Sequence, residues 1–257
     1  MRSNIETKNK LTLVSELGNE SKFQILKYNE LSGINRVDSV SAIKKIENSG
    51  QRLKQVRILL NESAVKIQNN ELSYMKGYIE RNDLIHEYKG IKKLIFDSKQ
   101  IIASKDKTIF KGSGEILLKS SFSDFTLIEL VDEEIIISDS MFYACDEEIE
   151  IKSIKDNEKE IKLKGNGVVV LKLPVSEKEI IRCKLFNDRL TVNEDLVILK
   201  SSSINVGFEK YSNVVDDNVE QYINTFYYGI GEVWLLPTRS IYDKYVKINC
   251  CLEEFNE

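Results

Sequence analysis

Alternation of apolar and polar residues dominates the chain from about residue 55 onward. In the segment QVRILLNESAVKIQ, Val56, Ile58 and Leu60 recur at every second position, and Val65 and Ile67 resume the pattern after a polar interruption. A period of two places one face of a strand on a core and the other in water. Similar segments rich in β-branched and aromatic residues recur: KTIFKGSGEILLK, ELVDEEIIIS, EIEIKSI, EIKLKGNGVVVLKL, EIIRCKLFNDRLTV, DLVILKSSSINVGF and GIGEVWLLP. Short strands separated by turn signals predict an all-β sandwich or barrel.

The pattern divides the chain into three parts. We expect residues 1–50 to form a polar N-terminal segment with a strand or short helix, residues 51–240 the β domain, and residues 241–257 a C-terminal tail. The first part is expected to be a loosely packed start with a strand or two. Ser39–Lys54 then has roughly helical spacing that Ser49-Gly50 interrupts. Ser212–Tyr222 is expected to be a loop or a short helix.

A Gly-x-Gly sequence followed by an apolar strand occurs three times. Its glycines are Gly112 and Gly114, Gly165 and Gly167, and Gly229 and Gly231. Glycine at such positions lets the chain turn sharply, or lets another backbone approach closely, before a core strand. We therefore interpret these glycines as structural turns.

A second pattern alternates with the first. It consists of an apolar strand, a short Asn or acidic turn, and an apolar cluster 11 or 12 residues further on. Its three copies begin at Leu60-Asn61-Glu62, Leu130-Val131-Asp132-Glu133 and Leu185-Phe186-Asn187-Asp188. Asn and Asp suit turns because they tolerate left-handed backbone. The order of the two patterns indicates a unit used three times, with chance similarity among short β segments as the alternative.

Composition narrows the classes of function. The 257 residues include one His and two Pro, and 37 basic against 41 acidic residues give a net charge of −4. One His excludes a multi-histidine metal site, and mild acidity argues against nucleic acid as the default partner. No signal peptide and no apolar stretch of about 20 residues is apparent, and the four cysteines lack a CxxC pair. We expect a cytoplasmic protein with reduced thiols.

Candidate chemistry is sparse. The Gly-x-Gly sequences lack the third glycine and the helix that phosphate binding requires. His86 is expected to be a surface or packing residue, and Cys145 and Cys183 to be buried as small hydrophobes. For Cys250-Cys251, a soft-metal or redox role stays open. Acidic pairs are expected in solvated turns, with catalysis or cation binding as the alternative; they are Asp132-Glu133-Glu134, Asp146-Glu147-Glu148, Asp216-Asp217 and Glu253-Glu254.

Aromatic residues near the end of the β domain form the most conspicuous apolar feature. They are Phe226, Tyr227 and Tyr228, followed by Trp234. They fit a core edge best, and an interface between subunits or a ligand pocket is the alternative.

The segment RLKQVRILLNESAVKIQNNELSYMKGYIE, residues 52–80, resembles the altered inheritance of mitochondria protein 24 family. Residues 111–118, 140–145 and 229–235 resemble that family's further blocks, in the same order. Ser121-Phe122-Ser123-Asp124 departs from it, because a Pro-Gly is usual there. The resemblance implies a fold of the tryptophan RNA-binding attenuation protein type, a β-sandwich or double-stranded β-helix. It implies no catalytic residues, and fold alone does not transfer RNA binding.

These observations favour a non-enzymatic β scaffold that associates with itself or with a protein partner. The alternative is a small-ligand-binding β-barrel with Tyr228 and Trp234 lining its pocket. We expect no cofactor, no metal and no nucleic acid, while peripheral association with a membrane stays open.

Overall fold

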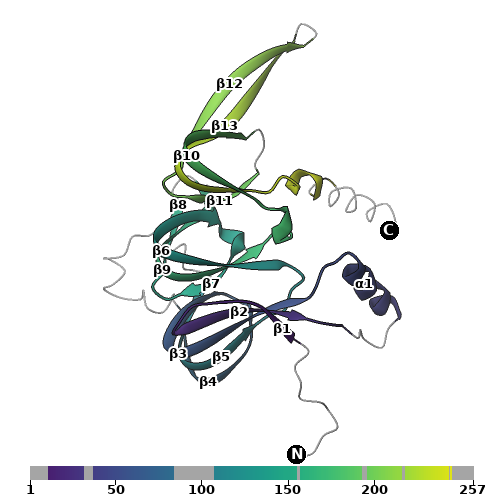
Figure 1. The fold of residues 1–257 in the computed structure, drawn as a ribbon, viewed down its shortest axis with the longest axis vertical. Helices are drawn as coiled ribbons and strands as arrows, with labels where there is room; N and C mark the ends of the chain where they lie inside the picture. The colour runs from purple at the N-terminus through teal and green to yellow at the C-terminus, as the bar shows by residue number, and fades with distance from the viewer. Residues whose placement is uncertain are drawn as a thin grey trace, which may run out of the picture.

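The computed structural model describes residues 11–31, 37–83, 107–154, 157–192, 196–215, 218–242 and 244. Its strands pair antiparallel throughout and form one connected 13-stranded sheet, which confirms the all-β prediction. The sheet coils into three groups of strands stacked along the long axis of the molecule (Figure 1). Figure 1 shows the first group at the bottom, the second in the middle and the third at the top.

Each group is contributed by one stretch of the chain. The first contains β1 (Leu11–Leu17), β2 (Ser21–Tyr28), α1 (Val37–Asn48), β3 (Lys54–Gln68), β4 (Leu72–Asp83) and β5 (Lys107–Leu118). The second contains β6 (Asp124–Ser138), the 3-10 turn η2 (Asp139–Met141), β7 (Phe142–Asp146), β8 (Glu150–Ile154) and β9 (Asn157–Leu173). The third contains η3 (Glu177–Glu179), β10 (Ile181–Val192), β11 (Val197–Ser201), β12 (Asn205–Val215) and β13 (Asn218–Leu235).

The main path through the sheet runs β1-β2-β3-β7-β9-β6-β11-β13-β10. Beside this path, β5 pairs with β3 and β4, β8 pairs with β9, and β12 pairs with β13. Two joins therefore connect the groups, β3 with β7 and β6 with β11.

The N-terminal strands belong to this same sheet. β1 and β2 form a hairpin, and β2 pairs with β3 from Ser21↔Leu60 to Lys27↔Lys54. Phe23 of β2 is fully buried, so the prediction of a loosely packed start is wrong for β2. Its apolar residues are covered because β2 lies beside the core strand β3. A boundary at residue 50 therefore separates strands that pair with each other.

Two local predictions have different outcomes. The helix expected over Ser39–Lys54 is α1, which ends at Asn48 beside the predicted break, and Gly50 follows with φ +85°. The prediction of a loop or short helix over Ser212–Tyr222 is wrong. The described residues of this segment, 212–215 and 218–222, extend β12 and β13, which pair as far as Val215↔Asn218 in a hairpin that projects from the third group (Figure 1). Cross-strand pairing decides the structure there over the local polar composition.

Each group contains one long strand pair interrupted by a β-bulge. Two residues of β3, β6 or β10 oppose the single middle residue of a Gly-x-Gly in β5, β9 or β13. One residue of each bulge has left-handed backbone: Glu62 (φ 53°), Asp132 (φ 58°) and Asn187 (φ 62°). A bulge bends its strand and increases the local twist, so these bulges help the sheet coil.

Apolar side chains fill the space between neighbouring groups. One buried cluster joins the first and second groups and includes Val65, Ile67 and Ala144. Another joins the second and third groups and includes Ile135, Ile137 and Leu199. A smaller cluster of Leu185, Ile204 and Val233 lies within the third group.

Candidate functional site

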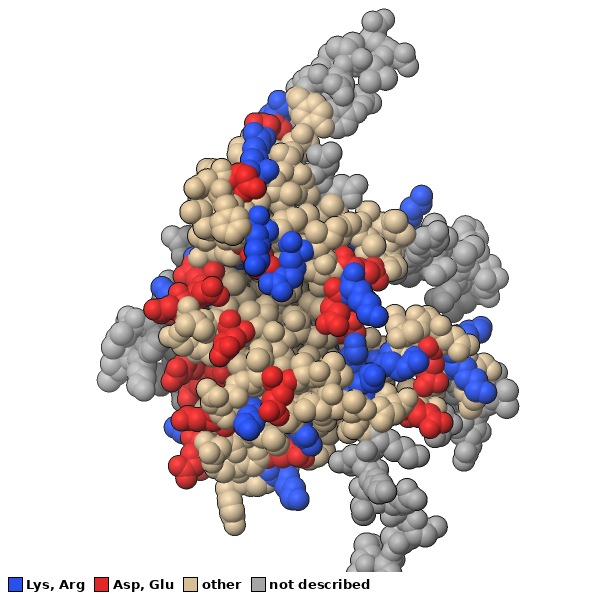
Figure 2. Space-filling model, in the orientation of Figure 1, with Lys and Arg blue, Asp and Glu red and all other residues tan. Residues whose placement is uncertain are grey.

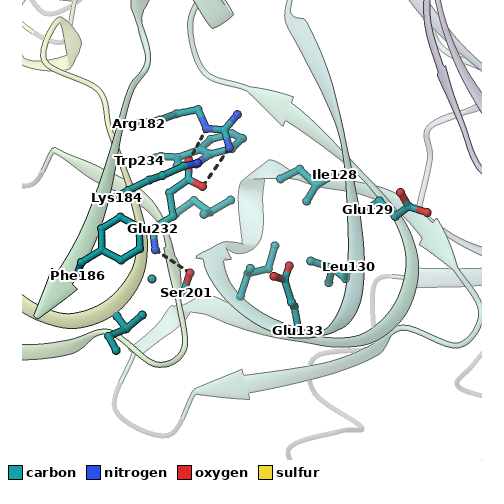
Figure 3. Close-up of a pocket in the computed structure, with 14 residues that line it drawn as sticks. Ile128, Glu129, Leu130, Glu133, Arg182, Lys184, Phe186, Ser201, Glu232 and Trp234 are labelled. Carbon is teal, nitrogen blue, oxygen red and sulfur yellow. Dashed lines mark hydrogen bonds and ion pairs between the residues drawn. The ribbon is translucent and has the colours of Figure 1, made fainter.

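A groove of about 360 Å³ lies between the second and third groups, with walls from β6, β10, β11 and β13 (Figure 3). Leu130, Ile135 and Leu199 make its lining apolar on the side of the core. Phe186 and Ile230 also line it, and they are 73% and 57% exposed. The two exposed side chains lie opposite each other in the β10–β13 pair, so the bulge of the third group presents them together.

A polar cluster closes one part of the groove. The Arg182 guanidinium binds both carboxylate oxygens of Glu232, with Nη2 3.0 Å from Oε2. Trp234 Nε1 donates to Glu232 Oε1 at 2.8 Å, and the guanidinium carbon lies 5.0 Å from the centre of the Trp234 ring. The Glu232 backbone N–H donates to Ser201 Oγ at 2.9 Å. Figure 3 shows Arg182, Glu232 and Trp234 gathered on one side of the groove.

Charge pairing limits the chemistry of this cluster. The hydrogen bond from Arg182 lowers the pKa of Glu232 below its ordinary value, although partial burial opposes the shift. The same hydrogen bond raises the pKa of Arg182. A carboxylate held ionised by an arginine is a poor proton carrier near neutral pH. The arrangement instead positions the Trp234 indole and suits binding by apolar contact.

Metal binding was a further candidate chemistry for the acidic residues. Across the described ranges, no group of three or more His, Cys, Asp or Glu side chains could hold a metal ion. Asp146 is half-buried, and burial raises the pKa of its carboxyl. Its Oδ2 accepts a hydrogen bond from the Val168 backbone N–H at 2.7 Å. Asp132 lies in a bulge inside β6, and Glu134 pairs with Lys162 at 2.6 Å.

The predicted aromatic patch is divided between two faces of β13. Tyr227 packs on the small core cluster of the third group on one face, and Trp234, on the other face, is 7% exposed and lines the groove. Phe226 and Tyr228 lie on one face with their ring centres 5.7 Å apart. The Arg189 guanidinium stacks 3.9 Å above the Phe226 ring. Tyr228 is 44% exposed but does not line the groove, so the four residues do not form one pocket.

The Gly-x-Gly glycines lie inside strands rather than at chain reversals, so the interpretation as turns is corrected. All six have positive φ, and the alternative of close backbone approach describes their geometry. At Gly112 (φ 138°), a Cβ would collide with the Tyr78 carbonyl oxygen of β4. At Gly167 (φ 136°), a Cβ would lie 2.8 Å from Asp146 Oδ2. The remaining four are Gly114, Gly165, Gly229 and Gly231.

The predicted cysteine and histidine positions are only partly described. Cys145 is fully buried, and this burial raises the pKa of its thiol to about 12, which makes it unreactive. Cys183 is half-buried rather than buried. His86, Cys250 and Cys251 lie outside the described residues, as do Asp216-Asp217 and Glu253-Glu254.

Sequence reasoning missed the exposed apolar residues at the two ends of the molecule. On β4 these are Tyr74, Met75 and Tyr78, which are 45%, 43% and 93% exposed. On the β12–β13 hairpin, Phe208 and Ile223 are 68% and 55% exposed. Period-two alternation does not reveal these exposed residues, because it carries no information on whether another strand covers a given face or edge.

The charged surface is mixed. On the face seen in Figure 2, basic and acidic side chains are interspersed over all three groups. No helix among the described residues is long and apolar enough to cross a membrane.

Comparison with known proteins places the chain in a family. Residues 46–238 match the family described as mitochondrial biogenesis AIM24. The fold is similar to the crystal structure of a Streptococcus pyogenes protein, with a TM-score of 0.52 and 17% sequence identity over 77% of this chain and 94% of that one. No curated protein matches the chain. The matched segment contains the three bulged strand pairs and all the residues that line the groove, and the chain therefore belongs to the mitochondrial biogenesis AIM24 family.

Proposed function

We propose that this protein is a non-enzymatic β scaffold that associates with itself. The observation that carries the proposal is the placement of exposed apolar side chains on paired strands at both ends of the molecule. Tyr74 and Met75 lie on β4 at one end, and Phe208 and Ile223 lie on the β12–β13 hairpin at the other (Figure 1). Exposed strand edges and apolar patches are surfaces at which proteins associate.

The three groups are, in this proposal, copies of one unit related as in a double-stranded β-helix. Support comes from the same bulge opposite the same Gly-x-Gly in each group. A chain built of units that each bury a face on the next leaves two unmatched faces at its ends. Self-association is a direct way to cover such faces.

Sedimentation velocity between about 1 and 100 μM tests the scaffold proposal. We expect one or more species heavier than the 29.6 kDa chain, with a population that rises with concentration. A protein that sediments as a single monomer over the whole range would contradict it. The measurement needs no knowledge of a ligand or of a second protein.

A second candidate function is small-ligand binding in the groove. Its specific support is the apolar lining beside the Arg182–Glu232–Trp234 cluster, since concave apolar sites with a few placed polar groups are typical of ligand pockets. The interiors of the strand groups are filled by side chains, so the groove, and not a barrel lumen, is the proposed site.

Trp234 is the one tryptophan in the sequence, so its fluorescence reports on the groove directly. We expect a saturable change in emission when a panel of apolar and aromatic metabolites contains a ligand, and loss of that change in Phe186→Ala. Phe208→Ala is the matched control, because Phe208 is similarly exposed but lies outside the groove. No response to the panel, or an equal response in both variants, would count against this candidate.

The proposal also includes a protein as partner and a cytoplasmic location. A net charge of −4 and the mixed charges of Figure 2 support a protein rather than a nucleic acid as partner. A cytoplasmic location and the absence of cofactors stay predictions.

A further inference from the structure

The two joins between the groups have the same register. Each uses the third, fourth and fifth residues after the left-handed residue of a bulge. The pairs are Val65↔Asp146, Lys66↔Cys145 and Ile67↔Ala144 in the first join, and Ile135↔Ser201, Ile136↔Lys200 and Ile137↔Leu199 in the second.

A backbone hydrogen bond beside these pairs also recurs. The Glu147 N–H donates to the Ala64 carbonyl at 3.0 Å in the first join, and the Ser202 N–H donates to the Glu134 carbonyl at 2.9 Å in the second. Both acceptors lie two residues after the left-handed residue. One geometry therefore connects the first group to the second and the second to the third.

The third group carries the same positions without a following group. Counting from Asn187, they are Leu190, Thr191 and Val192 on β10. In the described part of the chain, β10 pairs only with β13, so its other edge is open. Alternate residues of an antiparallel strand direct their N–H and C=O groups to opposite sides. By the pattern of the joins, Arg189 and Thr191 direct theirs to the open edge.

Each join has a second strand, β7 or β11, which pairs with the bulged strand of the preceding group. The equivalent strand of the first group is β4. The residues after each Gly-x-Gly pair with β4, β7 or β11 in one register, with the same one-residue irregularity. The pairs are Leu72↔Leu118, Tyr74↔Leu117 and Met75↔Ile116; Phe142↔Leu171, Ala144↔Val170 and Cys145↔Val169; and Val197↔Leu235, Leu199↔Trp234 and Lys200↔Val233. Tyr74 and Met75 thus occupy the positions of Ala144 and Cys145.

The exposed fractions of these equivalent residues differ between β7 and β11, which each pair with a strand of the preceding group, and β4, which has no preceding group among the described residues. Ala144 and Cys145 are 0% exposed and Leu199 is 4% exposed, because a strand of the preceding group covers them. Tyr74 and Met75 are 45% and 43% exposed. The first group therefore presents to solvent the surface that the other two groups bury.

The apolar residues beside the joins follow the same pattern. Each of the two large core clusters contains the same three positions beside the bulge: Leu60, Val65 and Ile67 of β3, or Leu130, Ile135 and Ile137 of β6. The equivalent residues of the third group are Leu185, Leu190 and Val192. Leu185 and Leu190 belong to a smaller cluster that has no neighbouring group packed on it among the described residues. The third group thus lacks the cover that completes the other two cores.

We propose that β10 of one chain pairs antiparallel with β4 of a second copy of this chain. Leu190 then lies opposite Lys76, Thr191 opposite Met75 and Val192 opposite Tyr74. The inference rests on the proposed self-association and specifies its surfaces. A second copy is the occupant because both surfaces belong to this chain and match each other in the register of the two internal joins.

Two further features follow from this contact. The Gly77 N–H of the second copy donates to the Arg189 carbonyl, in place of the hydrogen bond seen at each join. Because the two surfaces differ, the contact is head-to-tail, and it produces a closed ring or an open chain of molecules.

Proline substitutions test the contact one surface at a time. Thr191→Pro and Met75→Pro each remove an N–H that faces the second copy, while the bonds of the same strands to β13 and β5 remain. We expect each variant alone to be monomeric in sedimentation velocity. An equimolar mixture is expected to form a dimer of twice the 29.6 kDa chain mass and nothing larger, since only one intact pair of surfaces remains.

Disulfide cross-linking provides a second test that leaves the strands intact. Directly opposite residues in an antiparallel pair have Cα atoms about 4.5–5.5 Å apart, which a disulfide spans. We expect Thr191→Cys protein mixed with Met75→Cys protein to give an intermolecular disulfide, identified by mass spectrometry of the linked peptides. Tyr78→Cys is the matched control, because Tyr78 is 93% exposed on the same strand but lies out of register.

The outcomes separate this inference from the broader proposal. A wild-type protein that remains monomeric at 100 μM overturns both. A wild-type oligomer that persists in both proline variants, without the Thr191–Met75 cross-link, overturns the head-to-tail contact and leaves self-association standing. Circular dichroism and Trp234 fluorescence establish whether each variant is folded. If a proline variant is unfolded, the cross-link between Thr191→Cys and Met75→Cys protein tests the contact between β10 and β4 in its place.

Discussion

At the scale of single residues, each bulge depends on glycines in the strand opposite. Two residues of one strand crowd against the middle of a Gly-x-Gly, and the flanking glycines adopt positive φ. In the first two groups, the middle side chain also caps the bulge. Ser113 Oγ accepts from the Glu62 N–H at 2.9 Å, and Asn166 Oδ1 accepts from the Asp132 N–H at 2.7 Å. In the third group, Ile230 occupies this position and faces the groove instead.

Gly112→Ala tests the need for close approach. A methyl group there would meet the Tyr78 backbone, which cannot move away without breaking the β4–β5 ladder. We expect a loss of about 3 kcal/mol or more in the free energy of unfolding, measured by urea denaturation. Gly50→Ala is the control, since Gly50 also has positive φ but has nothing within 4 Å of a Cβ. Its expected cost is about 1 kcal/mol, and equal losses in the two variants would contradict the steric explanation.

At the scale of elements, long strands serve more than one neighbour. β3 pairs with β2 along its first half, with β7 at Val65–Ile67 near its end, and with β5 along most of its length. The bulge changes the direction of the strand between the two halves. β2 is held in the core by this arrangement, although its surrounding sequence is polar.

Phe23→Ala tests whether β2 belongs to the structural core. Phe23 is 0% exposed and packs in the cluster between the first and second groups, so its truncation leaves a cavity. We expect a loss of about 3–5 kcal/mol in the free energy of unfolding by chemical denaturation. Leu13→Ala on the neighbouring β1 is the control, because Leu13 is 50% exposed, and its expected change is within about 0.5 kcal/mol. A loss below 1 kcal/mol for Phe23→Ala would indicate that the hairpin is peripheral.

At the scale of the whole molecule, polar contacts reinforce the joins between groups. Lys54 at the start of β3 pairs with Asp124 at the start of β6, and the Glu177 N–H beside the third group donates to Asp124 Oδ2 at 3.0 Å. Burial raises the pKa of Asp124, but the Lys54 ammonium and the Glu177 N–H together hold it below its ordinary value. This carboxylate therefore links residues from all three segments of the chain.

The pH dependence of stability tests that link. A carboxyl whose pKa is lower in the folded than in the unfolded state stabilises the fold fully above its unfolded pKa of about 3.8. The stabilisation is lost as pH falls through the lower folded value. We expect Asp124→Asn to be less stable than wild type at pH 6, with the difference shrinking below about pH 4. Glu147→Gln, at an exposed site, is the control, and a constant Asp124→Asn difference from pH 6 to 2.5 would contradict the ion-pair explanation.

Much of the fold was predictable from local patterns. Alternation from Val56 onward is a property of each strand by itself, so it can be recognised without knowing which strand pairs with it. The break at Ser49-Gly50 likewise follows from local helix chemistry, and α1 ends beside it. The prediction for Ser212–Tyr222 was wrong because residues 212–215 and 218–222 are held in strands by pairing between β12 and β13.

The candidate sites were less predictable. Trp234 was identified as conspicuous, but the groove it lines also needs Leu130 and Phe186, which lie on other strands far away in the sequence. Tyr74 and Met75 look like ordinary strand residues. Their significance appears only when their exposure is compared with the buried Ala144 and Leu199.

The sequence by itself determined the strand content, the family and the three places where Asn or acidic residues and Gly-x-Gly alternate, because each depends on residues close together in the chain. Only the tertiary structure decided that these two patterns face each other across strand pairs. It also decided which edges are covered, since burial depends on what packs from elsewhere in the chain. Among the described residues, the outer edges of β4 and β10 have no paired strand, which is a property of the assembled sheet.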